Sequence, residues 1–395
     1  MINFKALFFA SAALFLSGGL TSCAKDEVTP VRLEFGRKYD AAIPLWDLDT
    51  TSNTYLVGNV KKIGYTDLTG LIESRKQSFV LLIADVNTTC LCFSYLRESL
   101  IAYLKVSNAF VYAINPTEFN GGVKNYDLKV SSAEGYETVA IFEKGALKYQ
   151  RQRNGQDDAW SKDSATFISW MEARVSVSSM LYIDLKQLEA AVNGTASLNG
   201  LDQFTIGFFR DRCTDCRYLS DNFLLTYNAG THGESYVIDC DVPGIHDPKD
   251  GTTDPTTESK AAWTAFKDKY GLSTTTNTTL GYGSGYVPCF QNRQNGEIRD
   301  MEVYVNDDIS LNADQSTCSI SDTYWDGSRS HEFFDSAKTD VVKDFKQVAA
   351  LKAISKDDYS TIVYEGQTYY SWNHDKAAIY HDPLLQSFLD YYVAK

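Results

Sequence analysis

The chain carries the same order of apolar and polar patterns twice. In the first copy the run SFVLLIADV at 78–86 is apolar throughout, as expected of a strand buried on both faces. Lys144-Gly145 lies between two strand-like segments and marks a hairpin turn. The patterns predict this order: strand 55–65, helix 66–76, strand 78–86, helix 94–108, strand 109–116, hairpin 136–152 and helix 163–175.

The second copy begins at about residue 179 and repeats the alternation. Asn295-Gly296 marks its hairpin turn. Alternating strands and helices, followed by an antiparallel hairpin and a helix, predict an α/β fold with two domains, each a mixed sheet flanked by helices. The expected order is strand 179–185, helix 186–194, strand 203–212, helix 217–229, strand 235–244, helix 261–273, hairpin 285–307 and helix 382–395.

Two segments lie outside this repeat. A stretch rich in Tyr, Trp and Asp, at about 307–380, is predicted to be an insertion in the second domain. At the other end Lys5 precedes an apolar stretch, Ala6 to Leu16, that is too short for a membrane span and is typical of an export signal. The predicted organisation is a signal peptide at 1–22, a tether at 23–52, a first domain at 53–178 and a second domain at 179–395.

Charge and cysteine content narrow the class of protein. The formal net charge is −14, and no basic stripe is visible that would bind a phosphate backbone, so nucleic acid is not an expected partner. The export signal predicts a location outside the cytoplasm, where disulfides form. Of the eight cysteines, seven follow Cys23, and an odd number cannot all pair within one chain.

Cys213 and Cys216, in the sequence FTIGFFRDRCTDCRYLSDNF, lie between a predicted strand and a predicted helix. They are either a redox pair or a structural disulfide, although so short a loop would add little stability. Zinc usually takes four ligands, and the chain has no second CxxC and no closely spaced histidine pair. No metal or cofactor is therefore predicted, while the redox and structural roles both stay open.

The second copy resembles thioredoxin over about 178–305 and the terminal helix. The order of elements is similar, the CxxC lies between the second strand and the second helix, and Tyr286-Val287-Pro288 lies where thioredoxins have a cis-proline facing the CxxC. The resemblance implies a catalytic site of Cys213, Cys216 and Pro288. In this site Cys213, just before a helix, is the nucleophile with a lowered pKa, and Cys216 is the shielded resolving thiol.

Neighbouring residues are expected to modify this site. Asp215 should disfavour the thiolate, whereas Arg212 and Arg217 should favour it, which leaves the direction of exchange open. Cys289 directly follows Pro288 and would lie beside the pair, as a further redox thiol, as a metal ligand or as a small apolar side chain. Cys240, in VIDCD, is expected to be a buried core thiol.

The first copy resembles the same fold more weakly. GYETVAIFEKG aligns with the thioredoxin segment around the cis-proline, but Glu137 replaces the proline. The place of the CxxC is taken by Cys90-Leu91-Cys92, a CxC motif. Cys90 and Cys92 are secondary redox candidates, and the other interpretation is a degenerate domain kept for shape or for binding.

The segment Leu20-Thr21-Ser22-Cys23 resembles the lipobox of bacterial lipoproteins. In that family the cysteine is acylated and becomes the new N-terminus, and two or three acyl chains anchor a protein stably. The resemblance implies lipidation at Cys23 and an extracytoplasmic location at the cell envelope or surface. The alternative is an ordinary cleaved signal peptide.

Two functions follow from these observations. The first is a membrane-anchored, extracytoplasmic thiol–disulfide oxidoreductase whose partners are protein thiols or disulfides. The alternative is a non-catalytic surface lipoprotein that uses two thioredoxin-like domains as a binding scaffold.

Overall fold

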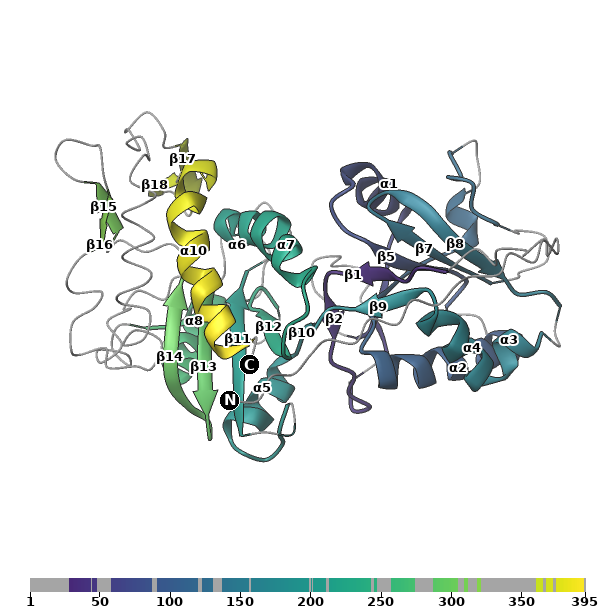
Figure 1. Ribbon diagram of the computed structural model, residues 1–395, viewed down its shortest axis with the longest axis horizontal. Coiled ribbons are helices and arrows are strands. Elements are labelled where there is room, and N and C mark those ends of the chain that lie inside the picture. The colour runs from purple at the N-terminus through teal and green to yellow at the C-terminus, as the bar shows by residue number, and fades with distance from the viewer. Residues whose placement is uncertain are drawn as a thin grey trace, which may run out of the picture.

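The structure of the protein is a computed structural model. It describes residues 28–43, 45–47, 58–86, 91–119, 123–130, 137–155, 158–198, 200, 202–210, 213–242, 245–246, 257–273, 287–304, 309–311, 318–320, 360–364, 367–371 and 374–393. Within these ranges two six-stranded sheets form the centres of two domains (Figure 1). Both sheets are mixed and flanked by helices, which confirms the expected α/β class.

The first sheet has the order β3-β4-β6-β5-β7-β8. Its strands are β3 (Trp46–Asp47), β4 (Val60–Lys62), β5 (Phe79–Ile83), β6 (Val111–Ile114), β7 (Thr138–Glu143) and β8 (Ala146–Gln152). The first four are parallel, whereas β7 is antiparallel to β5, and β8 to β7. Its helical elements are α1 (Tyr65–Ser74), α2 (Leu91–Ser107), the 3-10 turn η1 (Pro116–Phe119), α3 (Ala159–Lys162) and α4 (Ser164–Glu172).

Helices on both faces explain the continuous apolar run of β5. Successive side chains of a strand point to opposite faces of its sheet. Leu81 and Ile83 belong to the core beneath α1, whereas Val80 and Leu82 belong to the core beneath α2 and α4. All five residues of β5 are buried, so each position has to be apolar.

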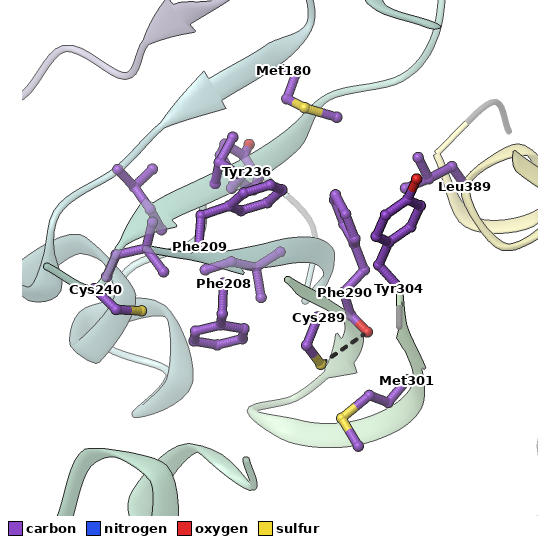
Figure 2. Close-up of a cluster of buried hydrophobic side chains, with 14 of the residues drawn as sticks. Met180, Phe208, Phe209, Tyr236, Cys240, Cys289, Phe290, Met301, Tyr304 and Leu389 are labelled. Carbon is purple, nitrogen blue, oxygen red and sulfur yellow. Dashed lines mark hydrogen bonds between the residues drawn. The ribbon is translucent and has the colours of Figure 1, made fainter. Parts of the chain in front are cut away.

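The second sheet has the order β14-β13-β11-β12-β10-β2. Its core, shown in Figure 2, combines Phe208 and Phe209 of β11 with Phe290 of β13 and Leu389 of the C-terminal helix. The strands are β2 (Gly36–Arg37), β10 (Met180–Tyr182), β11 (Gln203–Phe209), β12 (Ser235–Asp239), β13 (Cys289–Gln294) and β14 (Glu297–Val303). The helical elements are α5 (Leu185–Val192), α6 (Thr214–Tyr218), the π-helical η2 (Leu219–Leu224), α7 (Leu225–Asn228), α8 (Thr257–Tyr270) and α10 (His374–Tyr392).

Apart from the edge strands β2 and β3, the two sheets share one topology. In each, the strands lie in the order first, third, second, fourth, fifth, and only the last two are antiparallel to their neighbours. This is the thioredoxin-like arrangement. The hairpins also match: a Cβ added to Gly145 would lie 2.4 Å from the Ile72 carbonyl at the end of α1, and one added to Gly296 would lie 2.2 Å from the Val192 carbonyl at the end of α5.

The N-terminal segment differs from the expected tether. β1 (Val31–Leu33) pairs in parallel with β9 (Val175–Val177), and β2 adds to the second sheet beside β10. Val31 and Leu33 are buried in the core of the first domain. Figure 1 shows β1, β9 and β2 at the junction of the two domains. Strands of two or three residues are too short to produce an alternating pattern of apolar and polar residues. For that reason the sequence predicted a tether here.

The C-terminal part also departs from the expected boundaries. Two hairpins lie within the predicted insertion: β15 (Ile309–Leu311) with β16 (Cys318–Ile320), and β17 (Ser360–Tyr364) with β18 (Gln367–Ser371). α10 begins at His374 instead of Asp382. Asp-Pro is typical of a helix start, but here Pro383 lies inside the helix, so that signal misplaced the boundary.

Candidate functional site

The CTDC segment lies where β11 leads into α6. Cys213 is the N-cap residue of α6, and its sulfur accepts a hydrogen bond from the backbone N–H of Cys216 at 3.3 Å. Cys213 is half-buried, whereas Cys216 is only 2% exposed, and both are free thiols. Cys213, the more exposed residue of the two, thus lies just before the helix, and Cys216 is shielded in its first turn, as the sequence predicts.

The Val287–Pro288 peptide approaches this pair from a distant part of the sequence. The peptide bond is cis, and the Cys213 thiol donates to the Val287 carbonyl oxygen at 3.5 Å. Pro288 directly precedes β13, and Cys289 at the start of β13 pairs with Phe208 near the end of β11. The antiparallel pairing of β13 with β11 therefore brings Val287 and Pro288 to the CTDC segment.

The two thiols differ in pKa because of hydrogen bonding and burial. The pKa of Cys213 is lowered, chiefly because the Cys216 thiol donates a hydrogen bond to its sulfur. Burial and the charge of Asp215 oppose this shift, and the Cys216 N–H and the Arg210 charge support it. Burial raises the pKa of Cys216 well above the usual value. Thus Cys213 is the sulfur that ionises first, which makes it the stronger nucleophile of the pair at neutral pH.

A buried charged cluster lies next to the pair, and the sequence analysis did not identify it. Arg210 Nε contacts Asp241 Oδ1 at 2.9 Å, and His246 Nδ1 lies 2.9 Å from the same oxygen. The Arg210 guanidinium also lies over the Trp263 ring, 5.6 Å from its centroid. The backbone N–H of Arg210 donates to the Cys216 sulfur at 3.4 Å. The only sequence signal was a charged residue directly after an apolar strand, and its partner is 31 residues away.

Comparison with known proteins finds structural likeness only. No protein-family model matches the sequence, and no curated protein matches it. Human ERp44 matches with 11% identity and a TM-score of 0.26, over 65% of this chain and 52% of its own, so the match spans about half of that protein. A structure of ERdj5 matches with 11% identity and a TM-score of 0.22, over 63% of this chain and 28% of its own.

A third similar structure is that of the first two thioredoxin domains of Saccharomyces cerevisiae Eps1p. It matches with 9% identity and a TM-score of 0.20, over 62% of this chain and 91% of its own. Matches with such low identities and TM-scores carry no argument about this chain. The thioredoxin-like fold of both domains rests on the strand order and register of the chain itself.

Two further thiols of the second domain, Cys240 and Cys289, are buried. Cys240 and Cys289 are 0% and 1% exposed, and Figure 2 shows both among the aromatic side chains of the core. Burial raises the pKa of each thiol. The Cys289 thiol contacts the Phe290 carbonyl oxygen at 3.8 Å. Cys289 therefore has the surroundings of a core residue, which fits its interpretation as a small apolar side chain.

In the first domain the counterpart of Pro288 is Glu137. It directly precedes β7, as Pro288 directly precedes β13, so the predicted correspondence is confirmed. The Glu137 carboxylate forms a buried ion pair with Nε of Arg153, and Arg153 Nη1 donates to the Gly155 carbonyl at 2.7 Å. An ion pair thus occupies the place from which the second domain presents Val287 and Pro288 to its cysteines.

Several predicted residues lie outside the described part of the chain, namely Cys23, Cys90, Arg212, Tyr286 and the side chain of Cys92. Arg217 is described and exposed. Within the described ranges no three His, Cys, Asp or Glu side chains are grouped as metal ligands. Nor does any helix of those ranges have the length and apolar character needed to cross a membrane.

Proposed function

We propose that the protein is an extracytoplasmic thiol–disulfide oxidoreductase that acts through Cys213 and Cys216 and is anchored to a bacterial membrane by lipid on Cys23. The observation that carries the redox part is the state of Cys213: its pKa is lowered, and it lies at a helix N-terminus against the Val287 carbonyl. The anchor part is supported by the sequence Leu20-Thr21-Ser22-Cys23 after an export signal.

The proposed reaction needs no other group. The Cys213 thiolate attacks one sulfur of a substrate disulfide, forms a mixed disulfide and releases the other sulfur as a thiolate, which takes up a proton. Cys216 then loses its proton and attacks the Cys213 sulfur, which releases the second substrate thiol. The substrate gains two electrons and two protons, and the pair becomes a disulfide. The reverse sequence oxidises a substrate dithiol.

The second candidate is a binding scaffold without catalysis. It is favoured by the first domain, where the Glu137–Arg153 pair replaces the proline segment. Both candidates can be tested on the same reduced protein, because only the oxidoreductase requires a thiol with a lowered pKa.

Alkylation of Cys213 across a pH series tests the proposal. Only the thiolate reacts, so a lowered pKa shifts the half-maximal rate to lower pH than the value of about 8.5 for a free thiol. In Cys216→Ala the main hydrogen bond to the Cys213 sulfur is lost, so its curve should move to higher pH. Mass spectrometry of the labelled peptides gives both curves. If Cys213 labels no faster than buried Cys240 in the folded protein, the scaffold is the better description.

The first domain should not be an independent oxidoreductase. We expect Cys90→Ser with Cys92→Ser to leave disulfide exchange by the whole protein nearly unchanged, because Glu137 replaces the proline that would hold an extended substrate beside those sulfurs. Reduction of a model protein disulfide is the measurement, with Cys213→Ser as the comparison. A loss in the double variant as large as that in Cys213→Ser would contradict this assignment.

A further inference from the structure

A cavity of about 780 Å³ lies between the two domains and borders the redox pair. Lys61 and Tyr112 line it from the first domain, Phe35 from the N-terminal segment, and Tyr182 and Cys216 from the second domain. Cavities of this size at a domain interface are the usual places for ligands. The N-terminal segment and both sheets contribute to the walls, so the cavity exists only because the domains are joined.

Contacts between the domains hold the cavity in a defined shape. The Arg37 N–H donates to the Asn108 carbonyl at 2.8 Å, and Asn59 Nδ2 donates to the Arg37 carbonyl at 2.8 Å. Lys76 and Asp221, one from each domain, form an ion pair of 2.7 Å at the wall of the cavity. A site bounded by such fixed contacts is ordered before a ligand arrives, which lowers the cost of binding.

The walls carry aromatic rings from both sides. In the first domain Tyr112 meets Phe79 and Phe110 edge to face, with ring centroids 5.9 and 5.0 Å apart. On the other side Phe35 lies against Tyr182, with centroids 5.7 Å apart. All five rings line the cavity, and rings so placed favour aromatic or aliphatic groups of a ligand.

The charge of the lining is opposite to that of the whole chain. Six cationic side chains line the cavity against three acidic ones, although the chain as a whole has a net charge of −14. Two of these cations are ion-paired, Lys76 with Asp221 and Arg210 with Asp241. The cations are Arg37, Lys61, Lys76, Lys186, Arg210 and Arg217. A positive cavity attracts a negatively charged ligand.

We propose that this interdomain cavity binds an acidic segment with aromatic side chains, from the polypeptide whose sulfur exchanges with Cys213. The inference rests on the proposed function. Cys216 lines the cavity, and its backbone nitrogen lies 3.3 Å from the Cys213 sulfur. A polypeptide joined to Cys213 is therefore held close to the cavity. The second domain supplies the reacting sulfurs, and the first supplies rings and positive charge for the flanking residues.

Two neighbouring lysines of β4 give a matched test. Lys61 lines the interdomain cavity, whereas Lys62 points to the other face of the sheet, toward Ala84 and Asn115. The probes are a fluorescent peptide of Asp, Glu and Phe and a counterpart with Lys and Arg in place of the acids. Binding is measured on the Cys213→Ser protein, so the result does not depend on exchange, and failure of the redox proposal would be seen separately in the alkylation curves.

The acidic peptide should bind more tightly than the basic one, and added salt should weaken it. Lys61→Glu should reduce its affinity by about tenfold, equivalent to ~1.4 kcal/mol, whereas Lys62→Glu should leave it unchanged. Phe110→Ala, which changes a ring and no charge, should also weaken it. Equal binding of the two peptides, equal loss in both lysine variants, or binding of phenylpropionate without binding of the peptide would overturn the proposal.

Discussion

Cys216→Ser will accumulate a covalent complex between Cys213 and its substrates. The attacking thiol remains, but the resolving thiol is gone, so the mixed disulfide persists. The burial of Cys216 is the physical reason for this division of roles: its sulfur is shielded and its pKa is raised well above the usual value, whereas the pKa of Cys213 is lowered. Non-reducing electrophoresis followed by mass spectrometry of the trapped species is the measurement.

Two further variants make this result decisive. Cys213→Ser should trap almost nothing and reduce exchange to background, because Cys216 cannot reach a protein disulfide from its buried position. Cys240→Ser, which changes a core thiol away from the helix N-terminus, should behave as the unmodified protein does. If the Cys213 and Cys216 variants trapped equal amounts of substrate, neither cysteine would be the preferred attacking thiol, and the mechanism would be contradicted.

Glu137→Ala will destabilise the first domain by about 3–5 kcal/mol, the usual cost of leaving one buried charge without its partner. The Glu137 and Arg153 side chains are 4% and 2% exposed, so neither can turn to water when the other is removed. Urea unfolding, followed by the fluorescence of Trp160 in the same domain, measures the change in the free energy of unfolding.

The same hairpin supplies the control. Glu143 and Lys148 also form an ion pair between β7 and β8, but both side chains are nearly half exposed, so Glu143→Ala should leave stability nearly unchanged. Replacing the buried pair together, Glu137→Leu with Arg153→Met, should recover most of the loss because no charge remains buried. A loss in Glu143→Ala equal to that in Glu137→Ala would show that the buried charge is not the cause.

The fold was largely predictable because its main elements carry local signals. The continuous apolar run of β5 and the turns at Lys144-Gly145 and Asn295-Gly296 are each set by neighbouring residues. The position of Pro288 was predictable from the order of elements. The strands β1 and β2 were not, because each is too short for a pattern and its partner lies far along the chain, as with Val31 and Val175.

The pKa values of the two cysteines depend on distances between side chains, and the sequence pattern does not contain those distances. The sequence suggested opposing effects of Asp215 and two flanking arginines, and could not decide between them. In the structure the pKa of Cys213 is lowered chiefly by the hydrogen bond from Cys216, and among the described arginines Arg210 adds to this effect. Arg210 meets Asp241 and His246 only after β11 and β12 have paired. The interdomain cavity likewise requires the placement of one domain against the other.

The position of β1 limits how far the molecule can reach. On the proposal that Cys23 carries lipid, only the segment 24–30 separates the membrane from the first strand at Val31. At about 3.3–3.6 Å per residue, fully extended, this segment spans roughly 25 Å, whereas a tether to residue 52 would have spanned roughly 100 Å. Such a short segment would hold Val31, and with it the junction of the two domains, within roughly 25 Å of the bilayer. The folded domains would then stand directly on the membrane surface, with no long flexible linker between them and the lipid.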